Sequence, residues 1–157
     1  MGVNLRFIEG WGESEMHLIG LVLVVALMVA AVMSGGTLMQ FVNAPSLLVT
    51  FVGGHAALYA VYGKDAFTVF SSGFAESQPA RGARIARAGA RLYILAAWVG
   101  VLIGGIQMAV GLEDMRAFGP ALGVCALTIF YGYLMQLLVW VPLETYMEEK
   151  ALAKGAA

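Results

Sequence analysis

The chain has 157 residues, of which 61% are hydrophobic and 12% are charged, with a formal net charge of −1. About a quarter of the residues of an ordinary soluble domain are charged, and a soluble domain of this length cannot bury so much apolar surface in one core. The composition therefore excludes an ordinary soluble protein and predicts an integral membrane protein, whose partners include the lipid bilayer and no nucleic acid.

Four continuous apolar runs are long enough to cross a bilayer, which requires about 20 mostly apolar residues. They cover residues 17–34, 46–62, 92–110 and 118–141, and none contains Asp, Glu, Lys or Arg. Strands of a membrane β-barrel would alternate apolar and polar residues instead. We therefore predict an all-α fold with four transmembrane helices, in a single membrane domain over residues 1–157.

The distribution of Lys and Arg predicts the orientation, because cytoplasmic loops are enriched in both residue types. One cation precedes the first run, five lie between the second and third, and two follow the fourth, whereas only Arg116 lies on the opposite side. Both termini, the short loop 63–91 and the tail 143–157 are therefore predicted to lie in the cytoplasm, and the tail is predicted to be a solvated helical extension. Three tryptophans, Trp11, Trp98 and Trp140, are interpreted as aromatic anchors near the membrane surface or on lipid-facing turns.

Four arginines dominate the loop between the second and third runs. They follow Pro79, which suits the first turn of a helix, at spacings of three, three and four residues. A helix that starts at Pro79 and continues into the third run carries all four on one face. This basic face is interpreted as an anchor that contacts anionic lipid; the alternative is a docking surface for a cytoplasmic partner. The four residues are Arg81, Arg84, Arg87 and Arg91.

Three segments carry a resemblance to a known family. The first is GGTLMQFVNAPSLLVTFVGG (35–54), with a glycine pair at each end; the second is VGVLIGG (99–105); the third is GPALGVCALTIFYGYLMQLLVWVP (119–142), with a Thr before a Tyr-Gly pair and a closing proline. Together with the order of the four spans, they resemble the MotA/TolQ/ExbB family, and most closely the flagellar stator subunit MotA. The motif residues are Gly35, Gly36, Pro45, Ser46, Gly53, Gly54, Gly100, Gly104, Gly119, Pro120, Gly132 and Pro142.

The resemblance implies an assembly and an activity. Five copies would form a pentameric collar around two single-span helices of a MotB- or ExbD-like partner, which supplies the titrating aspartate. The chain would then be a MotA-like subunit of an ion-driven 5:2 rotary motor, expected to be proton-driven, in the bacterial inner membrane. The loop 63–91 lacks the long cytoplasmic helices through which flagellar relatives engage the rotor, so contact with a standard flagellar rotor is not expected.

Two departures from the family pattern keep other functions open. Val101 stands where sodium-driven members carry a threonine, which favours protons as the ion. Ile129 replaces a second threonine that proton- and sodium-driven members share, which counts against ordinary conduction. A passive ion channel and a non-conducting membrane scaffold of the same family are therefore the alternatives.

The polar residues inside the third and fourth runs are the candidates for an ion path. Thr128 and Tyr131 lie three residues apart and share a helical face, and the resemblance implies that such hydroxyls line the pore. The alternative is structural, because a membrane Thr can bond its own backbone one turn back and a Tyr can sit at a helix crossing. The candidates are Thr128, Tyr131, Gln107 and Gln136.

His55 is the one titratable side chain well inside a run, since His17 lies at the edge of the first. Titratable groups are costly at membrane depth unless they function there, but we expect a hydrogen-bonded packing histidine in preference to a proton relay. The sequence contains no phosphate loop, no metal-ligand spacing and no nucleophile constellation, so we expect neither an enzyme nor a cofactor. Glycines in the third and fourth runs are interpreted as close-packing positions: Gly100, Gly104, Gly105, Gly119, Gly123 and Gly132.

Overall fold

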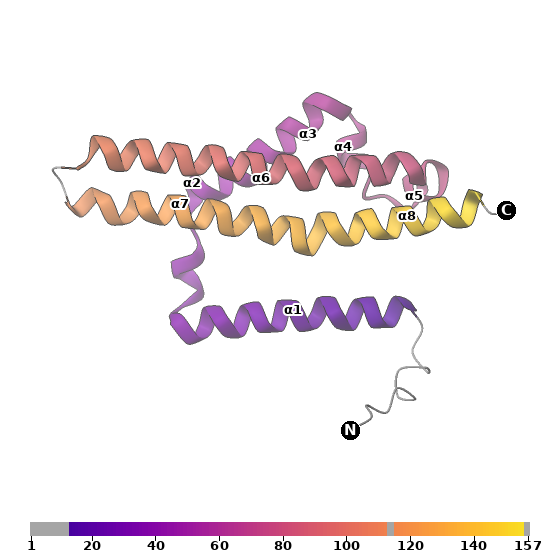
Figure 1. The fold of residues 1–157 in the computed structure, drawn as a ribbon, viewed down its shortest axis with the longest axis horizontal. Helices are drawn as coiled ribbons and strands as arrows, with labels where there is room; N and C mark the ends of the chain where they lie inside the picture. Colours follow the sequence, from indigo (N-terminus) through magenta and orange to yellow (C-terminus); the bar gives the residue numbers. More distant parts are fainter. Residues whose placement is uncertain (1–12, 113–114, 156–157) are drawn as a thin grey trace, which may run out of the picture. The chain divides into compact units, whose positions relative to one another are not determined.

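The computed structural model describes residues 13–112 and 115–155, which fold almost entirely as helices with no strand among them (Figure 1). The all-α class predicted from the sequence is thus confirmed for this part of the chain. The chain divides into two compact units, residues 1–41 and 42–157. The single membrane domain stays a prediction.

The first unit contains helix α1 (Glu13–Gly35) and a short 3₁₀ helix, η2 (Leu38–Phe41). Helix α1 starts four residues before the predicted run. Its apolar part, Ile19–Gly35, is a 17-residue helix, about 26 Å long at 1.5 Å per residue, slightly less than the roughly 30 Å of a bilayer core. A membrane-spanning role for α1 stays a prediction.

The second unit begins with one continuous helix over Ala44–Tyr62, in which α2 (Ala44–Leu47), the π-helical segment η3 (Leu48–Gly53) and α3 (Gly54–Tyr62) follow one another without a break. We refer to it as helix 44–62. Asn43 caps its start, and its side-chain oxygen accepts a hydrogen bond from the Ser46 backbone N–H at 3.0 Å. This is the usual role of Asn before the first helical turn.

The π-helical segment aligns the buried face of helix 44–62. Ser46, Thr50, Gly54 and Leu58 are buried at spacings of four residues. In a regular α-helix with 3.6 residues per turn, residues at this spacing drift gradually around the axis. A π turn holds more residues than an α turn, so η3 keeps the four positions on one side.

The segment 63–78 is more ordered than the predicted loop. Gly63, at φ 58°, ends helix 44–62, and two short helices follow, α4 (Asp65–Thr68) and α5 (Ser72–Ser77). Helix α6 then begins at Pro79, as predicted, and continues to Val110. The connection 63–91 thus contains α4 and α5 besides the predicted start of α6, and these two helices form because the side chains of Ala66, Val69, Phe74 and Ala75 are buried and pack in the core.

A second long helix packs antiparallel beside α6, as Figure 1 shows. It consists of α7 (Met115–Met135), the π-helical segment η4 (Gln136–Trp140) and α8 (Val141–Gly155). The helix thus starts before and ends after the predicted 118–141 run. Neither proline of the third motif lies at a helix end: Pro120 lies within α7, and the chain stays helical through Pro142. Because proline removes a backbone donor, π turns and kinks are typical beside it, and η4 directly precedes Pro142.

Small residues allow α6 to lie close to its neighbours. Its buried side is mostly Gly and Ala, and buried residues recur along it every three or four positions: Gly82, Ala86, Gly89, Tyr93, Ala97, Gly100 and Gly104. Small residues permit close approach of helices in membranes, where dispersion contacts drive association.

The interpretation of Trp140 as a surface anchor is wrong. Its side chain has no exposed surface; the indole ring lies over Gly89 and packs 5.4 Å, between ring centroids, from both Phe70 and Tyr93. The missing side chain at position 89 creates the space that the indole fills. Trp98, in contrast, is half exposed, and its role as an anchor stays a prediction; Trp11 lies outside the described residues.

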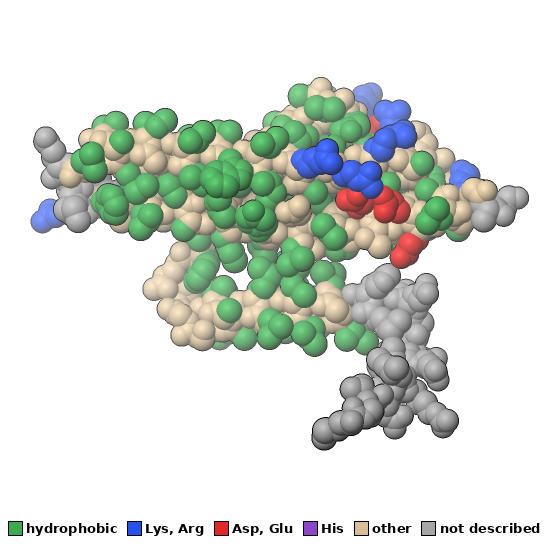
Figure 2. Space-filling view, in the orientation of Figure 1, with side chains coloured by type: hydrophobic (Ala, Val, Ile, Leu, Met, Phe, Trp, Pro, Cys, Tyr) green, Lys and Arg blue, Asp and Glu red, His purple; other side chains and the backbone are tan. Residues whose placement is uncertain are grey.

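Three helices are long and apolar enough to cross a membrane: Ala44–Tyr62, Pro79–Val110 and Phe118–Gly155. Large apolar side chains remain exposed along them, and Figure 2 shows green side chains over most of the second unit, with basic and acidic side chains gathered over one end of α6 and α8. In water such extended apolar surface would be unfavourable. The structure is that of a multi-pass membrane protein.

Candidate functional site

Thr128 lies where the three motif segments meet. Its side chain has no exposed surface, and its hydroxyl donates to the carbonyl oxygens of Val124 at 2.8 Å and Cys125 at 3.0 Å, one turn back in α7. This is the structural alternative considered from the sequence, in which a membrane Thr bonds its own helix.

Helix 44–62 brings two more hydroxyls to this place. The Ser46 hydroxyl bonds the Asn43 side-chain oxygen at 2.9 Å and the Val124 carbonyl at 3.3 Å, and the Thr50 hydroxyl donates to the Thr128 carbonyl at 3.4 Å. Ser46, Thr50 and Thr128 are the fully buried polar side chains among the described residues. A buried hydroxyl is costly without a partner, and each of the three has one.

Tyr131 adds the fourth hydroxyl. It is 5% exposed, and its oxygen accepts a hydrogen bond from the Asn43 backbone N–H at 3.2 Å. The ring lies 6.0 Å from the ring of Phe51, between centroids. The Asn-x-Pro-Ser turn that starts helix 44–62 is thus attached to the Thr-x-x-Tyr face of α7. We call Asn43, Ser46, Thr50, Thr128 and Tyr131 the hydroxyl seam.

Helix α6 contacts the hydroxyl seam and the adjacent part of α7 through glycines. A Cβ atom at Gly100 would lie 2.5 Å from the Thr128 methyl carbon, and one at Gly104 would lie 2.6 Å from Cys125 Sγ. Both distances are below any normal contact, so any side chain at either position would separate α6 from α7. The second motif therefore supplies the flat surface on which the third packs.

The glycine predictions divide into two groups. Gly54, Gly100, Gly104 and Gly132 are closely packed against Tyr93, Thr128, Cys125 and Ala97 respectively. In contrast, a Cβ atom would meet nothing within 4 Å at Gly35, Gly53, Gly105, Gly119 or Gly123, and one at Gly36 would meet the side chain of Gln40. Close packing at Gly105, Gly119 and Gly123 therefore has no partner among the described residues and stays a prediction.

The two glutamine candidates are not part of the seam. Gln107 is exposed near the end of α6, and Gln136 is partly exposed in η4, eight residues beyond Thr128, roughly 12 Å along the helix axis. The structure therefore brings together Thr128 and Tyr131 but neither glutamine. A pore-lining role for any of the four stays a prediction.

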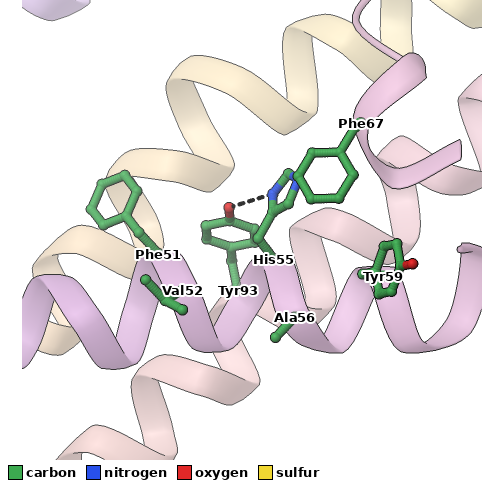
Figure 3. Close-up of a pocket in the computed structure, with 7 residues that line it drawn as sticks. All are labelled: Phe51, Val52, His55, Ala56, Tyr59, Phe67 and Tyr93. Atoms are coloured by element: carbon green, nitrogen blue, oxygen red, sulfur yellow. Dashed lines mark hydrogen bonds between the residues drawn. The ribbon is translucent and has the colours of Figure 1, made fainter. Parts of the chain in front are cut away.

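His55 forms a second polar contact, one residue after Gly54 in helix 44–62. Its Nδ1 lies 3.1 Å from the Tyr93 hydroxyl, and its ring packs 4.6 Å from that of Phe67, between centroids. Figure 3 shows these rings around a pocket of about 750 Å³ that Phe51 and Tyr59 also line. His55 thus has the packing geometry favoured from the sequence. The side chain of His17 lies outside the described residues.

The four arginines of the basic face are all exposed, on the side of α6 opposite its buried glycines and alanines. Two form ion pairs. Arg81 pairs with Asp65 of α4, and Arg87 pairs with Glu144, at 2.6 Å, and with Glu148 of α8. Arg84 and Arg91 form no ion pair with any described residue.

Sequence reasoning missed Asn43, Thr50 and Tyr93. Asn43 had a readable signal, because Asn three residues before Ser, with Pro between, is a helix-capping pattern. Thr50 lies four residues after Ser46 and so on the same face. Tyr93 had no local signal, since only the crossing of α6 with helix 44–62 brings it to His55.

The seam is polar and uncharged. Among its side chains there is no carboxylate, imidazole or amine, so at neutral pH it can donate and accept hydrogen bonds but cannot hold a charge.

No family model matches the chain, and no curated protein matches it either.

Proposed function

We propose that the chain is a MotA-like subunit of a proton-driven 5:2 rotary motor in the bacterial inner membrane, which converts the electrochemical gradient into mechanical work. Three helices capable of spanning a membrane support this, with α1 as the fourth span. The basic residues at one end of α6 support a cytoplasmic location for that end and for both termini.

One observation carries the proposal. The three segments that resemble the family, although separated by up to about a hundred positions in the chain, converge on Thr128: the first through Ser46 and Thr50, the second through Gly100. Convergence of motif residues at one buried point is what a shared core architecture requires.

The charge distribution assigns the titrating group to a partner. Residues 44–62, 92–110 and 118–141 contain no carboxylate, and proton transfer at membrane depth needs a titratable group there. In this proposal five copies surround two single-span helices, each bearing an aspartate. Protonation of that aspartate changes its fit within the collar, and ion flow steps the ring.

Native mass spectrometry of the complex purified from its own membranes tests the assembly. We expect five copies of this chain with two copies of a single-span protein that carries an aspartate within its span. A monomer, dimer or trimer without such a protein contradicts the motor.

Flux measurements test the seam. In vesicles containing the complex, the double variant Thr128→Val with Tyr131→Phe should reduce proton flux. Thr145→Val is the matched control, because the Thr145 hydroxyl makes the same backbone bond, to Val141 at 3.1 Å, on an exposed part of α8. Equal flux in the wild type and the double variant would exclude a role of the seam in conduction.

A non-conducting membrane scaffold is the second candidate. The Thr128 hydroxyl bonds carbonyls of its own helix and is fully buried, which favours a structural junction. A scaffold would assemble as a defined oligomer and show no flux in the same vesicles, with or without the partner.

A further inference from the structure

An apolar groove lies between helix 44–62 and α6, separate from the hydroxyl seam. Its volume is about 530 Å³, and all of its lining residues are apolar or glycine. It follows α6 over residues 92–103, a length of about 16 Å. Its walls include Leu48, Val52 and Ala56 on one side and Leu95, Val99 and Ile103 on the other.

One cation lies at the end of this groove. Arg91 directly precedes Leu92, the first groove residue of α6, and lies one turn before Leu95, on the same face. Its side chain is exposed and forms no ion pair with any described residue. Arg81 and Arg87, by contrast, are neutralised by carboxylates of α4 and α8.

Two contacts show where Arg91 lies along the groove. Gly54 of helix 44–62 packs on Tyr93 of α6, and Asp65, which follows that helix, pairs with Arg81 of α6. Helix 44–62 and α6 therefore run antiparallel. Arg91 comes two residues before Tyr93, about 3 Å along the axis. It therefore lies beside the end of the groove, between the apolar part of α6 and its arginine-bearing end.

We infer that the groove and Arg91 together bind an anionic phospholipid, with one acyl chain in the groove and the phosphate on the guanidinium. Arginine binds phosphate through two parallel N–H donors, and basic pockets between membrane helices are suited to anionic headgroups. This inference rests on the chain spanning a membrane and is independent of ion-driven activity.

The length and composition of the groove suit an acyl chain. Its apolar lining extends over about 16 Å of α6, and no polar side chain interrupts it. A flexible chain of methylene groups can follow this lining, and its ester and phosphate groups reach the level at which Arg91 lies.

Native mass spectrometry with defined lipids tests the inference. The purified chain in mild detergent is incubated with phosphatidylglycerol or with phosphatidylcholine of the same acyl chains. We expect one retained phosphatidylglycerol per chain and weaker retention of phosphatidylcholine. Arg91→Gln should reduce retention of phosphatidylglycerol at least about fivefold, the ratio that corresponds to about 1 kcal/mol for one basic residue at a membrane surface. Arg91→Lys should restore part of it.

Two further variants distinguish lipid binding at this groove from general electrostatic attraction of anionic lipid. Arg84→Gln removes an equally exposed, unpaired arginine about 10 Å away along α6 and should leave retention unchanged. Gly53→Leu should abolish retention, because Gly53 lines the groove and a Cβ atom there meets nothing within 4 Å. If the Gly53→Leu variant fails to fold, Gly53→Ala replaces it, and a smaller loss of retention is expected.

Three results would overturn the inference. One is equal loss of lipid in the Arg84 and Arg91 variants, which indicates unspecific electrostatics. Another is equal retention of both lipids by the wild type. The third is a Gly53→Leu variant that keeps its lipid but loses an oligomer, which makes the groove a contact between protein helices.

Discussion

Thr128 packs directly on Gly100, so closely that a Cβ atom at position 100 would lie 2.5 Å from the Thr128 methyl carbon. The contact joins α6 to α7 at the level where helix 44–62 adds its own hydroxyls. Because Thr128 is fully buried, it has no free space into which it could move.

Gly100→Ala should therefore destabilise the protein. Overpacking a core by a methyl group costs about 1–3 kcal/mol, which exceeds the gain of up to about 1 kcal/mol that alanine brings to a helix. Gly105→Ala is the matched control on the same helix, because a Cβ atom there meets nothing within 4 Å. Thermal denaturation in detergent should show a lower midpoint for Gly100→Ala only. Similar midpoints for the two variants would mean that α6 and α7 are not in close contact.

Trp140 gives a prediction about a buried polar atom. Its Nε1 has no hydrogen-bond partner among the described residues, so Trp140→Phe loses packing volume but no hydrogen bond. A large-to-small exchange in a core costs more the larger the cavity that it leaves, and Trp→Ala costs about 3–5 kcal/mol; Trp140→Phe leaves a much smaller cavity and should cost clearly less. The phenylalanine variant should keep most of the stability of the wild type in the same denaturation assay. A loss as large as that of Trp140→Ala would indicate that Nε1 has a partner, such as a bound water.

The helices were largely predictable from local sequence. Continuous apolar runs identified the three long helices, and Pro79 marked the start of α6 because proline suits a first turn. The helical extension predicted after Pro142 is confirmed by α8. Proline after an apolar run usually ends a helix, yet the chain stays helical from η4 through Pro142 into α8.

The candidate site was predictable only in part. Helical spacing placed Thr128 and Tyr131 on one face, but it could not reveal which neighbour covers that face. Their partners Asn43, Ser46 and Thr50 are more than seventy positions away in the sequence. Trp140 shows the same limit, because an apolar aromatic residue near the end of a span is equally typical of a surface anchor and of a core, and only Gly89 on another helix decides between them.

Asn43 should matter for the start of helix 44–62. Asn43→Ala removes the acceptor for the Ser46 N–H and hydroxyl, and loss of such a cap costs about 1 kcal/mol. Asn43→Asp keeps the acceptor oxygen and is the control for the capping bond. The alanine variant should unfold at a lower temperature and show faster amide hydrogen exchange in the first turn of the helix. Unchanged exchange in that turn would contradict the capping role.

The pairing of His55 with Tyr93 connects helix 44–62 to α6, and a double-mutant cycle can isolate it. A neutral hydrogen bond contributes about 0.5–1.5 kcal/mol, so Tyr93→Phe should lower stability by this order while its ring stays over Gly54. In the background of His55→Phe, the same exchange should cost less, since the partner is already absent. Purely additive effects of the two exchanges would show that the groups do not interact.

The ion pairs of Arg87 should give a stabilisation that depends on salt. Arg87 reaches Glu144 and Glu148, one turn apart on α8, and joins the ends of α6 and α8. Salt screens charges near the surface, and exposed pairs contribute little unless several charges form a network. Arg87→Gln should therefore lower the thermal midpoint at low salt, with a smaller difference at high salt.

Arg84→Gln, which removes an arginine without an ion pair to any described residue, should leave the midpoint nearly unchanged at both salt concentrations. If both variants behave alike, the effect comes from total charge and the bridge between α6 and α8 does not contribute.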